Sequence, residues 1–119
     1  MRKLVTRVGR SVVLLSAGCL IGSMVISSAW ADDAQQVFAK NCVSCHGATG
    51  KGDGPASKML KPPPEDFAKA LTGMSDADIA KIIKEGGKAV GKAPSMPGYG
   101  SKLNDEQING LVTFIKGLK

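Results

Sequence analysis

The chain has 119 residues, 43% of them hydrophobic, and a formal net charge of +6. Four of its 16 basic residues lie in the first ten positions, so the 88 residues after position 31 carry 12 lysines against 10 acidic residues, a charge of only +2. With no arginine, no basic cluster and no interleaved aromatic residues there, the sequence gives no support to nucleic-acid binding, and its length allows one small domain.

Residues 1–31 have the pattern of an export signal. Four basic residues lie in the first ten positions, and an apolar stretch follows from Ser11 to Ser27. Ala29-Trp30-Ala31 then matches an A-x-A cleavage site. We therefore expect a signal peptide over 1–31, cleaved after Ala31, and a mature domain over 32–119 in a bacterial periplasm.

Two alternatives to this cleavage stay open. The apolar stretch approaches the length of a membrane span, so an uncleaved leader would anchor the domain with its face toward the periplasm. Ser16-Ala17-Gly18-Cys19 also resembles the lipobox of bacterial lipoproteins, although Ser16 stands where that motif usually has leucine. If cleavage occurs after Ala31, the mature domain has no membrane span and loses Cys19.

The mature part opens with a predicted short helix over 33–41, which carries Val37 and Phe38 into the run Cys42-Val43-Ser44-Cys45-His46. A C-x-x-C-H run is typical of c-type haem attachment. Two thiols three residues apart reach the two vinyl groups on one edge of a porphyrin and become thioethers. The adjacent imidazole then ligates the iron from below.

Other interpretations of these five residues are weaker. A structural zinc site needs four ligands, and the only further cysteine is Cys19, in the leader. A thioredoxin-type dithiol, the best of the alternatives, needs a βαβ setting that this strand-poor sequence does not suggest. A plain disulfide leaves His46 without a role. Export also favours haem attachment. In an oxidising compartment the two thiols would tend to form a disulfide, and bonding both to a haem prevents this.

Loops and short helices follow. Residues 47–55 form a glycine-rich loop, and Lys61-Pro62-Pro63-Pro64 predicts a stiff polyproline segment. A short helix over about 65–71 has acidic residues in its first turn and Phe67 facing inward. No strand pair or repeat is evident, so we predict an all-α fold of three to five short helices with long loops.

Two longer helices have clear start signals. Ser75 and Asp78 have the spacing of a capping box, ahead of a buried face at residues 79, 82 and 83, and Gly86-Gly87 ends that helix. Asn104 is the predicted N-cap of the last helix, with Gln107 three residues on. The apolar stripe of the last helix is formed by Ile108, Leu111, Val112 and Ile115, with Phe114 and Leu118 beside it.

The sixth iron ligand must be something other than a second histidine, because His46 is the only one. Of the three methionines in the mature part, we expect Met59 and Met74 to have packing roles. Met96 lies between Pro94 and Pro97 in the long loop over 87–101, where it can present its thioether to the iron. A thioether opposite an imidazole raises the reduction potential and closes the last coordination site, which favours electron transfer over substrate binding.

Taken together, the mature part resembles the small monohaem class I cytochromes c of bacteria. The resemblance rests on the C-x-x-C-H run at 42–46, Gly52-Asp53-Gly54-Pro55, Pro62-Pro63-Pro64, Met96-Pro97 and a last helix that begins Leu103-Asn104-Asp105-Glu106. It implies a cytochrome c fold wrapped around one covalently bound haem c, with His46 and Met96 as axial ligands. The class II four-helix cytochromes are disfavoured, since their attachment motif lies near the C-terminus.

The resemblance also implies finer contacts. The first and last helices of this family cross, which places Phe38 against Leu111 and Phe114. A proline carbonyl, here that of Pro55, accepts the second N–H of the proximal histidine. We further expect Tyr99 to donate to a haem propionate or to pack at the surface. The lack of arginine in the mature part departs from many relatives, in which arginine lies near the propionates.

The function that follows is a periplasmic one-electron carrier, a monomer that binds redox donor and acceptor proteins transiently and is not an enzyme. An alternative is a dedicated cytochrome c subunit of a respiratory dehydrogenase, oxidase or reductase complex. A less favoured alternative is a haem peroxidase or ligand sensor in which Met96 is absent from the iron or easily displaced.

Overall fold

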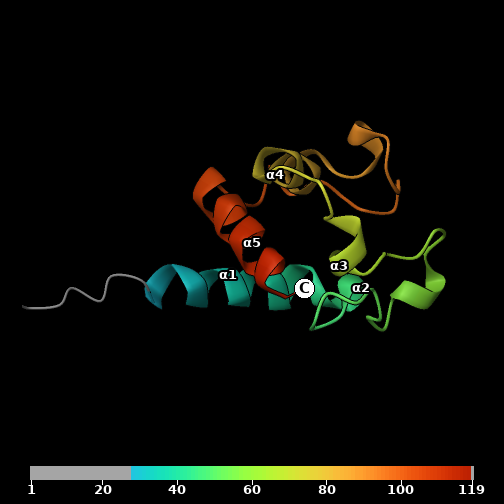
Figure 1. Cartoon of the computed structure of the whole chain (residues 1–119), viewed down its shortest axis with the longest axis horizontal. Coiled ribbons are helices and arrows are strands. Elements are labelled where there is room, and N and C mark those ends of the chain that lie inside the picture. Colours follow the sequence, from blue (N-terminus) through green and yellow to red (C-terminus); the bar gives the residue numbers. More distant parts are fainter. Residues whose placement is uncertain (1–27, 119) are drawn as a thin grey trace, which may run out of the picture.

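The computed structural model describes residues 28–118, which contain five α-helices and no strand (Figure 1). The helices are α1 (Ser28–Asn41), α2 (Val43–His46), α3 (Phe67–Ala70), α4 (Asp76–Glu85) and α5 (Asp105–Gly117). Two 3-10 turns lie at Ser57–Met59 and Lys88–Val90. The all-α prediction is therefore confirmed. The apolar stretch of the leader and Cys19 lie outside the described residues.

The first helix is longer than the sequence predicts. It begins at Ser28 instead of residue 33, so Ala31 lies inside its first turn. Asp32 and Asp33 are poorer helix formers than alanine, but they do not interrupt the helix. The two alanines just before them are strong helix formers and continue the helix upstream. None of the helices between residues 28 and 118 has the length and apolar character needed to span a bilayer.

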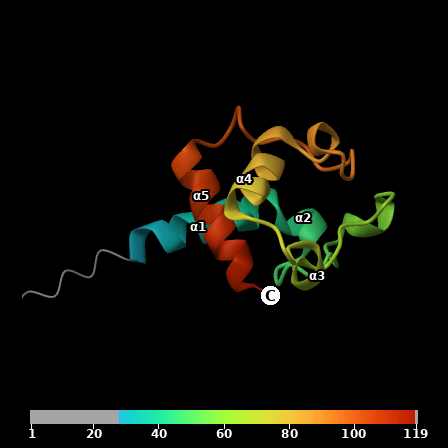
Figure 2. The same ribbon diagram turned by 45° about the horizontal axis from the view of Figure 1, so that its top comes forward.

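Helix α5 crosses over α1, and the two helices are in contact (Figures 1 and 2). At this contact the rings of Phe38 and Phe114 lie 5.3 Å apart between centroids. Leu111, only 1% exposed, belongs to the same buried cluster. The contact that the family resemblance implied is thus confirmed, and it fixes the end of α1 from which the C-x-x-C-H run leaves.

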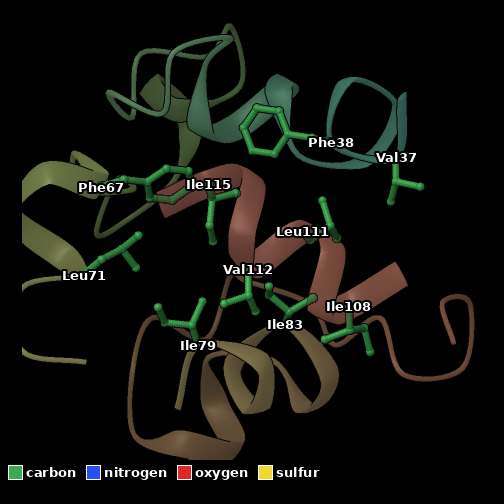
Figure 3. Close-up of a cluster of buried hydrophobic side chains, with 10 residues drawn as sticks. All are labelled: Val37, Phe38, Phe67, Leu71, Ile79, Ile83, Ile108, Leu111, Val112 and Ile115. Atoms are coloured by element: carbon green, nitrogen blue, oxygen red, sulfur yellow. The ribbon is translucent and has the colours of Figure 1, made fainter. Parts of the chain in front are cut away.

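Helix α4 packs on the other side of α5, and the core lies between these helices (Figure 3). Ile79 and Ile83 face Ile108, Val112 and their neighbours, while Ile82 is only half-buried. Two ion pairs, Lys84 with Asp105 and Lys116 with Asp76, also join α4 to α5. Because the four charged side chains are between 38% and 72% exposed, each pair adds at most about 1 kcal/mol, and apolar packing dominates this contact.

Both predicted capping boxes are present. Ser75 Oγ accepts from the amide of Asp78, and the Asp78 carboxylate accepts from the amide of Ser75. Asn104 and Gln107 make the equivalent pair at the start of α5. Helix α3 is shorter than predicted, because Asp66 serves as its N-cap by accepting from Ala68, instead of lying in its first turn.

Replacing Ser75 by alanine is expected to destabilise the haem-loaded protein by about 1 kcal/mol, because the first turn of α4 loses its side-chain acceptor. For a domain of this size, that lowers the melting temperature by about 4–8 °C. Thermal unfolding followed by circular dichroism measures this. Ser101→Ala, at an exposed turn, is the matched control and should change little. Equal melting temperatures for both variants would contradict the capping role.

Hydrogen bonds from Ser75 hold the pKa of Asp78 below its ordinary value. A carboxyl whose pKa is lowered by folding stabilises the fold above its unfolded pKa, and this contribution disappears as the pH falls through the lowered value. In the Ser75→Ala protein, the melting temperature should therefore fall less steeply on acidification. Parallel wild-type and variant curves between pH 6 and about pH 3 would speak against this.

Candidate functional site

The C-x-x-C-H run folds as a single helical turn directly after α1. Cys42 links the two helices, with its amide donating to the carbonyl of Phe38 at 2.9 Å. Its own carbonyl accepts from the amides of Cys45 and His46, at 3.2 and 2.9 Å. Gly47 then ends α2 with a φ of +78°. The turn therefore holds both thiols and the imidazole on one short, hydrogen-bonded element.

The glycine-rich loop folds back over this turn. The carbonyls of Ser44, Cys45 and His46 accept from the amides of Ala56, Gly54 and Gly52, at 2.8, 3.3 and 2.8 Å. These bonds satisfy carbonyls at a helix end, which have no partner within the helix. At Gly54, an added Cβ would lie 2.4 Å from the carbonyl oxygen of Ser44, so only glycine allows this approach.

His46 lies against an aromatic side chain that follows the polyproline segment. The centroids of the His46 and Phe67 rings are 4.9 Å apart, with an angle of 30° between their planes. Burial lowers the pKa of His46, which keeps the imidazole neutral and able to donate a lone pair to a metal. Its Nδ1 atom is buried and has no hydrogen-bond partner among the described residues.

Cys42 does not have the character of a redox-active cysteine. Burial, together with the neighbouring Cys45, raises the pKa of Cys42 to about 11. Reactive cysteines in disulfide oxidoreductases have a pKa below the ordinary value, because only the thiolate attacks. Both cysteines are partly buried and are not joined in a disulfide. The site thus disfavours the thioredoxin-type alternative.

An apolar cavity of about 340 Å³ opens beside the attachment turn. Cys42, His46 and Phe67 line it together with residues of α4 and of the 87–101 loop. Besides Phe67, the core residues that line it are Phe38, Leu71, Ile79, Ile83, Leu111 and Ile115. A smaller cavity, of about 70 Å³, adjoins the two cysteines. A mostly apolar space next to two thiols and a neutral imidazole fits a porphyrin held through sulfur and nitrogen.

The three methionines are placed very differently. Met96 lines both cavities together with His46, so the structure brings the two predicted ligands to the same space. Met74 is partly buried against the core, as predicted for a packing residue, and lines the larger cavity. Met59 is 78% exposed and lines neither cavity, so the predicted packing role for Met59 is wrong. It lies in an exposed 3-10 turn that leads into the prolines.

Tyr99 and Pro55 are the two remaining site residues that the sequence predicts. Tyr99 lines both cavities, and its hydroxyl donates to the carbonyl of Asn41 at 2.9 Å. The contact expected between Tyr99 and a haem propionate stays a prediction. Pro55 is exposed and lines neither cavity, and its carbonyl makes no bond to His46 Nδ1. Its predicted role stays a prediction.

Two residues of the site were not identified from the sequence. Phe67 was predicted to face the core, but its contact with His46 was not foreseen, since the two are 21 positions apart. Lys92 was counted with the surface lysines, yet it lies at the edge of the larger cavity. The sequence signal for Lys92 is its position, four residues before Met96 in a loop already assigned to the site.

The decisive comparison is with known protein families. The cytochrome c family model matches residues 31–119, which is most of the chain. The chain belongs to the cytochrome c family. Its cofactor is therefore a covalently bound haem c with its iron, and its chemistry is electron transfer.

Similar cytochromes c come from several sources. Cytochrome c6 of Gloeothece citriformis is 34% identical over 97% of this chain and 93% of that protein. Cytochrome c-553 of Helicobacter pylori is 28% identical over 83% of this chain and 93% of that protein. The oxidase subunit CcoP of Azospirillum brasilense, of the cbb3 type, is 26% identical over 76% of this chain, but the match spans only 29% of that subunit.

Solved structures show the same fold. The KustC0563 c-type cytochrome superposes with a TM-score of 0.59 at 27% identity, over 73% of this cytochrome and 98% of that chain. A chain of the Kuenenia stuttgartiensis reducing HAO-like protein complex gives a TM-score of 0.62 at 22% identity. That match covers 75% of this cytochrome and 43% of that chain, so it supports the fold alone.

Replacing Gly54 by alanine is expected to destabilise the haem-loaded protein by about 1–3 kcal/mol, because the new methyl group meets backbone that cannot move without opening the attachment turn. Denaturant unfolding followed by haem absorbance measures this. Gly117→Ala, where the structure leaves open space at the end of α5, is the matched control and should keep or slightly raise stability. Similar midpoints for the two variants would refute the close approach.

Proposed function

We propose that this cytochrome is a periplasmic one-electron carrier whose haem is bonded to Cys42 and Cys45 and ligated by His46 and Met96. The observation that carries the proposal is that His46 and Met96 line the same apolar cavity, with Cys42 at its wall. The haem supplies the redox chemistry, an iron that changes its charge by one. The protein supplies the two axial donors and the apolar surroundings.

The ligand set explains why the site favours electron transfer. With a nitrogen donor on one side and a thioether on the other, no coordination position remains for a substrate or a gas. His46 is the only histidine, so the chain has no second imidazole for acid–base catalysis at the iron. We propose on these grounds that the protein is a carrier and not an enzyme.

The unpartnered Nδ1 of His46 has a place in this proposal. A histidine that ligates a metal donates its other N–H to a nearby acceptor, which fixes the ring and raises its basicity. Pro55 belongs to the loop that folds over the attachment turn, one residue after Gly54. We propose its carbonyl as that acceptor once the haem is in place.

Export and partners complete the proposal. The leader over 1–31 supports a periplasmic location, with a membrane anchor as the alternative if cleavage fails. The mature domain would act as a monomer and meet donor and acceptor proteins through small, short-lived interfaces. Its nearly balanced charge does not suggest a permanent, strongly charged partner.

A second function is favoured by one specific comparison. The match to part of the oxidase subunit CcoP supports the alternative that this domain serves a single respiratory complex. Purification from the native membrane and soluble fractions distinguishes the two. A carrier is recovered alone in the periplasmic fraction, whereas a dedicated subunit is recovered in fixed ratio with its complex.

Replacing Met96 by alanine is expected to convert the haem from low spin to high spin, because the iron loses its sulfur donor. The reduced variant should then bind carbon monoxide rapidly, while the wild type should bind it slowly. Absorption spectra in both oxidation states, with and without carbon monoxide, measure this. Unchanged spectra would remove Met96 from the iron.

Met59→Ala and Met74→Ala are the matched controls for that experiment. Met59 is exposed, so its loss should change neither the spectrum nor the melting temperature. Met74 packs on the core, so its loss should lower the melting temperature but leave the haem low-spin. Rapid carbon monoxide binding by the wild type itself would favour the peroxidase or sensor alternative.

A further inference from the structure

The loop that carries Met96 is fixed to α4 by its backbone. The amide of Gly87 donates to the carbonyl of Met96 at 3.0 Å, which closes the loop on its own start. At the other end, the amides of Tyr99 and Gly100 donate to the carbonyls of Ile83 and Lys84, at 2.8 and 3.0 Å. These bonds fix the loop to the end of α4.

A single side-chain bond joins this loop to the end of α1. Tyr99 Oη donates to the carbonyl of Asn41 at 2.9 Å, across 58 positions of sequence. Within residues 28–118, no other hydrogen bond runs from the 87–101 loop to α1 or α2. Asn41 is the last residue of α1 and directly precedes Cys42, so the bond ends next to the haem-attachment turn.

Both ends of this bond suit it. A carbonyl in the last turn of a helix has no partner within that helix, and the Tyr99 hydroxyl supplies one to Asn41. Burial raises the pKa of Tyr99, so its hydroxyl keeps the proton that it donates. The ring itself lines both cavities and has Lys102 Nζ 5.9 Å from its centroid.

We propose that Tyr99 is a positioning residue, whose hydroxyl ties the Met96 loop to the end of α1 and so keeps the Met96 thioether in the cavity. The inference rests on the proposed function, because it concerns the retention of Met96 as an iron ligand. Tyr99 touches the loop and the helix end, and acts on the iron only through Met96. Its role is to slow the local opening that lets another ligand reach the iron.

The test compares wild-type and Tyr99→Phe haem-loaded protein in the ferric state, with cyanide as the added ligand. The variant keeps the ring and removes only the hydroxyl. Because one hydrogen bond is lost, cyanide should bind about 2- to 10-fold faster, at concentrations where opening of the loop limits the rate. Stopped-flow absorbance measures the rate, and equal rates for the two proteins would overturn the tether.

Ser75→Ala is the control for a general loss of stability. It weakens the start of α4, and its side-chain bonds touch neither the 87–101 loop nor α1. Its cyanide-binding rate should match the wild type. If Ser75→Ala and Tyr99→Phe accelerate binding equally, the opening is global and the proposal fails.

Two further measurements distinguish the tether from other roles of Tyr99. In the reduced wild type, the Tyr99 hydroxyl proton should give a slowly exchanging NMR resonance with cross-peaks to Asn41 or Cys42. This measurement needs no variant, and the lack of such contacts would overturn the tether. A changed pH dependence of the reduction potential in Tyr99→Phe, with unchanged cyanide rates, would also overturn it, in favour of a propionate contact.

Failure of this inference is distinguishable from failure of the proposed function. If the wild type binds cyanide as fast as Met96→Ala does, Met96 is not the ligand and the proposed ligation fails. If the wild type is slow, Met96→Ala is fast and Tyr99→Phe is slow, the ligation stands and only the tether is wrong.

Discussion

The packing of the core around one apolar cavity is the constraint on which the rest of this cytochrome depends. Seven of the ten residues in the buried cluster also line that cavity. The same side chains therefore form both the hydrophobic core and the cofactor site. The haem adds apolar surface to the core, which a chain of this size needs because its own buried apolar area is small. Stability and redox function draw on the same side chains.

The crossing of α5 over α1 gives this cavity its fixed wall. Phe38 contacts both Phe114 on α5 and Phe67 beside His46, with ring centroids 5.3 and 6.3 Å apart. A row of aromatic rings thus runs from the last helix to the His46 imidazole. The attachment turn follows α1 without a break, so the position of the cysteines is set by packing that lies one helical turn away.

Loop 87–101, which also lines the cavity, is held in place in a different way. None of the ten residues of the buried cluster comes from loop 87–101, and backbone hydrogen bonds to α4 hold the loop in place. A loop held in this way opens more easily than a packed helix, because few buried contacts oppose the opening. Within residues 28–118, the Tyr99 bond to Asn41 is the only hydrogen bond between loop 87–101 and helices α1 and α2.

Local sequence patterns determined much of this protein. The C-x-x-C-H run, the two capping boxes and the apolar stripe of α5 each depend on residues within a few positions of one another, so their chemistry is readable without a fold. Only the tertiary structure decided the contacts between distant positions, such as Phe67 with His46 and Tyr99 with Asn41. It also decided that Lys92 lies at the cavity and that Met59 is exposed to solvent. Spacing along the chain carries no information about such contacts, because they arise only when the loops close over the packed helices.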